Sequence, residues 1–207
     1  MSEIEPKWET IDRSLVHDGR VILYDHTVAL PDGSHTQYEV DASIPFAAAV
    51  LLVSGGHVLV TRQYRYPINR WIFDLPAGGA QDDEEPIDTA RRELEEEAGI
   101  VPISLVPLHT FFLNPGRASW PVHLFFSSEA TTSRTASRDD PAEQVSAVWL
   151  RVEELDSLIV KGEIVDPALI IARTMAASRE LMPPLELLCH QTVETVGTRQ
   201  SISPARR

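Results

Sequence analysis

The sequence predicts an α+β fold in which helices are layered on a mixed sheet, and three observations lead to that prediction. Most of the chain consists of short apolar segments separated by turn residues. Only two segments, Pro86–Ala98 and roughly residues 166–181, carry apolar residues at the three- and four-residue spacing of a helix. These helices do not alternate regularly with the strands, which argues against a fold built from βαβ units.

The N-terminal segment, residues 1–43, is predicted to be a small β appendage. It holds strand-like runs over 21–24 and 27–30, followed by a turn over 31–34. So few strands cannot bury a core of their own. We therefore expect this segment to pack on the main domain or on a second subunit.

The main domain, residues 44–182, is predicted to open with a β-hairpin. An apolar strand over 46–53 and a second strand over 57–63 are joined by a loop that contains Gly55 and Gly56. A third strand over 71–75 leads into a loop over 76–80.

The helix predicted over Pro86–Ala98 has clear boundaries, with a proline in its first turn and Gly99 as a stop signal. Ile87, Ala90 and Leu94 fall on one face. Further strands are expected over 105–113, 122–127 and 146–151, with a mobile loop over 127–140 and a loose tail over 183–207.

Composition excludes two classes of partner. The 207 residues include 18 Lys and Arg against 31 Asp and Glu, and the formal net charge of -13 repels nucleic acids and anionic membranes. Cys189 is the single cysteine, so we expect neither an internal disulfide nor a thiolate metal site. The longest apolar stretch, over 44–53, is too short to span a bilayer, and the polar start has no signal-peptide pattern. We therefore expect a cytoplasmic protein.

Glu93, Glu96 and Glu97 are spaced so that a helix places their carboxylates on one face within one turn. The three repel one another, and acidic residues near a helix C-terminus oppose the helix dipole. One interpretation is a solvated acidic face with Arg91 and Arg92 as partners. The other is a site for Mg²⁺ or Mn²⁺, which prefer such oxygen ligands. The spacing alone does not decide between them.

A longer pattern does decide, because it matches a known motif at every defining position. Gly78, Glu84 and residues 92–100 resemble the Nudix box. The chain therefore resembles the Nudix hydrolase family, which implies an α/β/α sandwich with a mixed sheet and a site that binds Mg²⁺. The implied roles are metal ligation by Glu93 and Glu97, ligation or water orientation by Glu96, positioning by Arg92, a tight loop at Gly78, and loop support by Glu84.

Segments outside the box narrow the substrate class. The ADP-ribose or ADP-sugar pyrophosphatases of this family resemble the chain over 62–66, 75–78, 114–116, 122–125, 143–150 and 162–166. This resemblance implies that the backbone carbonyl of Ala77 completes a metal site and that Arg65 contacts the diphosphate. It also implies an acidic loop residue that binds metal or acts as general base. Glu143 is the expected residue, with Asp139 and Asp140 as competitors.

The chain also departs from these relatives. Many of them carry a glutamate four residues after a Pro-Gly pair, where this chain has Trp120. Arg117 is a candidate phosphate contact and Trp120 a candidate stacking partner, with a surface arginine and a core tryptophan as the alternatives. Asp74 replaces the usual glutamate in the strand before the loop. In the relatives an N-terminal aromatic residue stacks on the adenine across a homodimer, and Tyr38 or Trp8 stands in the corresponding region.

The predicted function is Mg²⁺-dependent hydrolysis of the pyrophosphate bond of a nucleoside diphosphate sugar, with ADP-ribose giving AMP and ribose 5-phosphate. Mn²⁺ is a possible substitute, and the homodimer is implied by resemblance alone. The alternatives are GDP-mannose, another nucleotide sugar or an oxidised nucleotide as substrate, and a Nudix-fold sensor that binds ADP-ribose without cleaving it. The candidate residues are Glu143, Glu96 and Arg92 for catalysis, Arg65, Tyr38 and Arg117 for substrate binding, and Ala77, Glu93, Glu96 and Glu97 for the metal.

Overall fold

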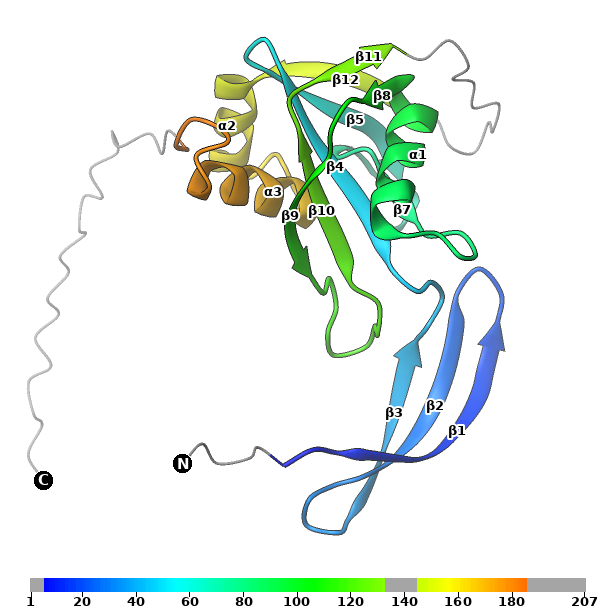
Figure 1. Ribbon diagram of the computed structural model, residues 1–207. Helices are drawn as coiled ribbons and strands as arrows, with labels where there is room; N and C mark the ends of the chain where they lie inside the picture. Colours follow the sequence, from blue (N-terminus) through cyan, green and yellow to red (C-terminus); the bar gives the residue numbers. More distant parts are fainter. Residues whose placement is uncertain (1–5, 133–144, 186–207) are drawn as a thin grey trace, which may run out of the picture.

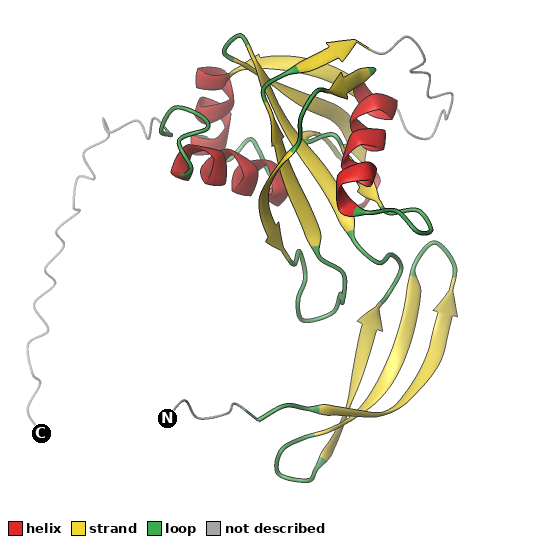
Figure 2. Ribbon diagram, viewed as in Figure 1, coloured by secondary structure: helices red, strands yellow, loops and turns green. Residues whose placement is uncertain are grey.

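The structure of the protein is a computed structural model that describes residues 6–132 and 145–185. Within these ranges the centre is a mixed sheet of seven strands (Figures 1 and 2). Helix α1 (Pro86–Ala98) covers one face, and helices α2 (Val152–Val160) and α3 (Pro167–Ser178) cover the other. This arrangement confirms the predicted α+β fold. A short 3-10 helix over Tyr66–Ile68 lies between two of the strands.

The main sheet combines one parallel pair of strands with antiparallel neighbours. The parallel pair is β4 with β10, and the remaining pairs are antiparallel. In the described residues the order is β12 (Ser146–Arg151), β5 (His57–Arg65), β4 (Ala47–Ser54), β10 (Val122–Ser127) and β9 (Val106–Phe111), with β6 (Arg70–Asp74) paired to β5 and β7 (Ala77–Gly79) paired to β4.

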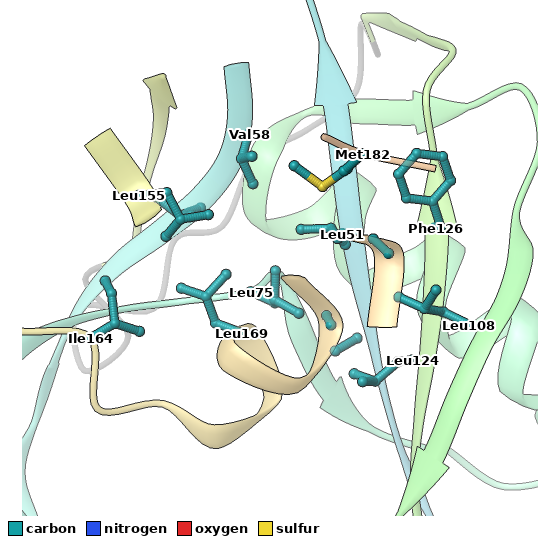
Figure 3. Packing of buried hydrophobic residues seen from close by; sticks show 14 of the residues in the cluster. Leu51, Val58, Leu75, Leu108, Leu124, Phe126, Leu155, Ile164, Leu169 and Met182 are labelled. Carbon is teal, nitrogen blue, oxygen red and sulfur yellow. The ribbon is translucent and has the colours of Figure 1, made fainter. Parts of the chain in front are cut away.

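The central strand β4 divides the core between the two faces of the sheet. Ala49 and Leu51 belong to the cluster under α2 and α3, and Figure 3 shows Leu51 among these residues with Leu169. Val50 and Leu52 belong to a second cluster, under α1. Because successive side chains of a strand point to opposite faces, both faces of β4 are buried. This burial explains why its sequence is a continuous apolar run rather than an alternating one.

Helix α1 begins and ends where the sequence predicts. Pro86 lies in its first turn, and Gly99 follows its last residue in the left-handed conformation, with φ 66°. Ala90 and Leu94 are fully buried against the sheet. Ile87 is more than a third exposed, so the apolar face is narrower at the start of the helix than the spacing predicts.

Several elements differ from the prediction. Helix α2 was not predicted, because nine residues give too short a pattern and its position depends on burial of Val152 and Leu155. Strand β7 stands where a loop was predicted over 76–80, because Ala77–Gly79 pairs with residues 47–49 of β4. The runs over 21–24 and 27–30 belong to a single strand, β2 (Ile22–Ala29).

Part of the predicted loop over 127–140 is described and forms a strand pair. Here β11 (Ala130–Thr132) pairs with β8 (Ile100–Pro102) in antiparallel fashion. Residues 133–140, residues 186–207 of the predicted tail, and Cys189 lie outside the described residues. Among the helices of the described ranges, none has the length and apolar character needed to cross a membrane.

The N-terminal sheet consists of β1 (Glu9–Asp18), β2 and β3 (His35–Asp41), paired in that order, and lies beyond one end of the main sheet, at the bottom of Figure 1. The N–H of Asp41 donates to the carbonyl of Arg117 at 2.7 Å, and the N–H of Ser119 donates to the carbonyl of Asp41 at 3.2 Å. Every residue of β1 is exposed, including Leu15 and Val16. Backbone hydrogen bonds at Asp41 therefore join the N-terminal sheet to the segment over 117–119 of the main domain. The apolar side chains of β1 remain exposed to solvent.

An ion pair between Arg173 and Asp156 joins α3 to α2 inside the protein. Nε and Nη2 of Arg173 each donate to one carboxylate oxygen at 2.7 Å, and the two side chains are 0% and 5% exposed. Nη1 of the same arginine donates to the carbonyl of Pro183 at 3.0 Å. This bidentate geometry fixes both the helix packing and the segment that follows α3.

Candidate active site

The backbone at Gly78 lies directly against the carboxylate of Glu93. Strand β7 runs beside α1, and Glu93, on that helix, is only 4% exposed. A Cβ atom at position 78 would overlap the Glu93 carboxylate. A side chain at position 78 would therefore have to displace the Glu93 carboxylate, which Arg92 holds in place.

Arg92 holds the acidic residues of this region together. Its Nη1 donates to Glu93 at 2.6 Å and to Glu96 at 3.3 Å. Nε and Nη2 donate to the two oxygens of Glu84 at 2.7 and 2.9 Å, and Nη2 also donates to the carbonyl of Gly79 at 3.0 Å. One guanidinium thus contacts three carboxylates, and through Glu84 and Gly79 it links the loop before α1 to the helix.

Glu84 stays ionised well below neutral pH because of these contacts. The hydrogen bonds from Arg92 lower the pKa of Glu84 to about 2, against the opposing effect of burial. The Gln81 N–H and the Thr89 hydroxyl also donate to it, at 3.0 and 2.8 Å. Because the pKa is lowered from 4.5, this stabilisation is present at neutral pH and is lost only as the pH falls toward about 2. The same hydrogen bonds raise the pKa of Arg92.

Glu97 contacts the residue that precedes Gly78. The Ala77 N–H donates to Oε2 of Glu97 at 3.0 Å, so Glu93 and Glu97 lie against consecutive residues of β7. In this conformation the described residues bring no three acidic or histidine side chains to the spacing of a metal site. Arg92 supplies the positive charge beside Glu93 and Glu96 instead. The donor chemistry, carboxylates gathered at a loop where a glycine makes room for one of them, fits Mg²⁺ or Mn²⁺.

Arg65, the expected diphosphate contact, is paired with Asp74. Nη2 of Arg65 donates to Oδ2 of Asp74 at 2.6 Å, and the two side chains are 48% and 4% exposed. Nε2 of Gln63 donates to the same oxygen at 2.8 Å, and the Thr61 hydroxyl donates to Oδ1. Asp74 is the last residue of β6, so this cluster stands directly before the segment that leads into Ala77.

Asp166, at the start of α3, interacts electrostatically with Asp74 and Arg65, although sequence reasoning gave it no role. It caps α3 by accepting a hydrogen bond from the Leu169 N–H at 2.7 Å. Burial raises the pKa of Asp166 to about 6; the negative charge of Asp74 adds to the rise, while Leu169 and Arg65 oppose it. A helix start at an Asp-Pro pair is visible in the sequence, but the effect of the Asp74 charge on Asp166 depends on tertiary packing that no local pattern reveals.

Tyr38 and Arg117 line one cavity of about 450 Å³ beside the N-terminal sheet. The Tyr38 ring meets Trp8 edge to face, with centroids 6.1 Å apart, and Nη1 of Arg117 lies 3.7 Å from Glu39. Neither Arg65 nor any glutamate of the box lines this cavity, so the predicted residues fall into two groups within the chain. The residues that line the cavity are Asp25, Gln37, Tyr38, Glu39, Gly116 and Arg117.

Trp120 is partly buried and packs against the core under α2 and α3. It also lines a second cavity, of about 320 Å³, next to the N-terminal sheet. Glu143, Asp139 and Asp140 lie outside the described residues, so a base on that segment stays a prediction.

Comparison with known proteins places these observations in a family context. A model of the NUDIX domain matches residues 44–170. Over 168 residues the chain is 34% identical to an ADP-ribose pyrophosphatase of Bacillus subtilis, covering 80% of this chain and 89% of that protein. It is 30% identical to a methanol dehydrogenase activator of Bacillus methanolicus (79% and 89% covered) and 28% identical to an ADP-ribose pyrophosphatase of Mycobacterium tuberculosis (78% and 79%).

The fold also resembles that of a solved structure. The crystal structure of an ADP compounds hydrolase matches with a TM-score of 0.71, covering 87% of this chain and 100% of that chain. At 18% sequence identity this likeness shows the fold alone.

Replacing Gly78 with alanine is expected to displace Glu93 and weaken the fold. The added Cβ would overlap the carboxylate, and overpacking of this kind costs about 1–3 kcal/mol. Gly116→Ala is the matched control, because a Cβ at position 116 meets open space. Chemical denaturation should show a lower free energy of unfolding for Gly78→Ala alone, and equal stability of the two variants would contradict the close approach.

Asp166→Asn is expected to change how stability depends on pH. Because the folded pKa is raised from 3.8 to about 6, the folded wild type binds more protons than the unfolded chain between these values. Its stability therefore gains from Asp166 as the pH falls from 7.5 to 5, and the asparagine variant lacks that gain. Asparagine still caps α3. Urea denaturation at both pH values should show the variant losing stability relative to wild type at pH 5; a pH-independent difference would contradict the assignment.

Proposed function

The chain belongs to the Nudix hydrolase family, and on that basis we propose that it cleaves the pyrophosphate bond of ADP-ribose, giving AMP and ribose 5-phosphate. The observation that carries the proposal is the contact of Gly78 with Glu93, held by Arg92, which gathers the carboxylates of the box at one loop. The similarity to two ADP-ribose pyrophosphatases supports the substrate class.

The proposed ligands of Mg²⁺, or of Mn²⁺ as a substitute, are Glu93, Glu96, Glu97 and the backbone carbonyl of Ala77. When bound, such a cation screens phosphate charge and lowers the pKa of a bound water. The formal net charge of -13 makes this screening necessary for an anionic substrate. Arg92 positions Glu93 and Glu96 through its Nη1 group.

The remaining roles concern the substrate. Arg65 donates hydrogen bonds to the diphosphate oxygens, which its half-exposed side chain can reach from the edge of the cluster around Asp74. Tyr38 stacks on the base, and Arg117, on the same cavity, binds a phosphate. Glu143 accepts the proton of the water that attacks phosphorus.

A homodimer completes the proposal. The cavity with Tyr38 and Arg117 does not include the box of its own chain, and a second copy would bring such a cavity to the box of the first. Strand β1 exposes Ile11, Leu15 and Val16, apolar side chains of the kind that association buries.

Glu97→Gln is expected to lower kcat for ADP-ribose by more than about 100-fold, because loss of a metal ligand costs more than the roughly 10–100-fold that loss of an outer-shell partner costs. Glu95→Gln, the same substitution on the same helix, is the matched control. Both variants and the wild type are assayed with Mg²⁺ and with Mn²⁺ on a panel of nucleotide sugars and an oxidised nucleotide, scoring the phosphate products. Circular dichroism checks the fold.

The panel also separates the alternatives. Near-normal turnover by Glu97→Gln would contradict the metal site. Faster hydrolysis of GDP-mannose or of the oxidised nucleotide than of ADP-ribose would identify that compound as the substrate. The proposed pyrophosphate hydrolysis would stand. Tight binding of ADP-ribose by the wild type without turnover would identify a sensor instead of an enzyme.

A further inference from the structure

We propose that Asp74 is a positioning residue whose buried carboxylate fixes the Arg65 guanidinium for diphosphate binding. The inference rests on the proposed function, because it takes Arg65 as a substrate contact. It adds a residue that acts through Arg65 and does not itself touch the substrate.

The strand geometry brings three donors to one carboxylate. Thr61, Gln63 and Arg65 alternate along β5, so their side chains lie on one face. In the pairing of β5 with β6, Asp74 stands opposite Thr61. Its side chain then accepts hydrogen bonds from Thr61, Gln63 and Arg65. The orientation of Asp74 is therefore set by the sheet and by two neutral donors, independently of Arg65.

Within residues 6–132 and 145–185, the arginine is held at one end. Its Nη2 group contacts Asp74 at 2.6 Å, and the side chain remains 48% exposed. A guanidinium has five N–H donors in a rigid fork, so one carboxylate contact leaves donors for a diphosphate oxygen. Asp166, which caps α3, stands near enough for the charges of Asp74 and Arg65 to act on its pKa, while the ion pair of Arg65 is with Asp74.

A purely structural ion pair has a different pattern of exposure in this protein. Arg173 and Asp156 are both buried, and all three nitrogens of the guanidinium donate to protein oxygens: the two Asp156 carboxylate oxygens and the carbonyls of Pro183 and Pro184. In the Arg65 pair only the acid is buried, while the cation reaches solvent. This asymmetry favours a pair that presents Arg65 to a ligand over a pair that only joins β5 to β6.

The test is a double-mutant cycle in the steady-state hydrolysis of ADP-ribose. Asp74→Asn should raise KM by between about tenfold and 100-fold, the cost of misplacing a binding group, with little change in kcat. In an Arg65→Ala background the same substitution should have no further effect on KM, because Asp74 acts through Arg65. Asp74→Glu keeps the charge and should bring KM most of the way back to the wild-type value. This variant also keeps the proposal testable if the asparagine variant folds poorly.

The matched control is Asp156→Asn, which removes the charge from the other buried acid. It should lower the melting temperature and leave KM unchanged. Additive effects of Asp74→Asn and Arg65→Ala on KM, or a comparable KM increase in Asp156→Asn, would overturn the positioning role while hydrolysis by the wild type upholds the proposed function. A wild type that hydrolyses no nucleotide sugar would overturn both.

Discussion

The Glu93 carboxylate can lie against β7 because Gly78 has no side chain between that strand and α1. Arg92 fixes the arrangement, since one guanidinium contacts Glu84, Glu93 and Glu96 and so offsets the repulsion among their carboxylates. The loop before the helix and the helix itself thus form one unit. Arg92 supplies positive charge to the acidic residues proposed as metal ligands. A cation bound by these carboxylates would take over part of that role.

The second part of the site depends on the sheet. β5 and β6 pair so that Arg65 and Asp74 meet, and three residues after Asp74 the chain enters β7 at Ala77. The segment between β6 and β7 therefore connects the pair of Arg65 and Asp74 to the contact between Ala77 and Glu97. In the box a single arginine contacts three acids, Glu84, Glu93 and Glu96, so these carboxylates outnumber the positive charge beside them and favour a cation when a diphosphate binds.

Local spacing placed the carboxylates on one face of a helix, and the match of residues 78–100 to a known motif assigned them to the box. The contacts of Arg92 with Glu93 and Glu96 lie within one helical turn, and both ends of α1 carry explicit signals in Pro86 and Gly99. The proximity of Asp166 to Asp74 could not be predicted in this way, because it depends on how α3 packs against the sheet. Short elements such as α2 and β7 escaped prediction for the same reason, since burial and strand pairing rather than sequence period determine them. Tyr38 and Arg117 line one cavity, and no residue of the box lines it. This separation within one chain results from the fold, so no sequence motif could predict it.

The central claim is that Glu93, Glu97 and the Ala77 carbonyl hold a divalent cation at the loop. Anomalous X-ray diffraction from crystals grown with Mn²⁺ tests it most directly. We expect an anomalous peak bounded by these three groups in the wild type and its loss in Glu97→Gln. A wild-type crystal with no peak at this position, or with Mn²⁺ held by other residues, would contradict the claim.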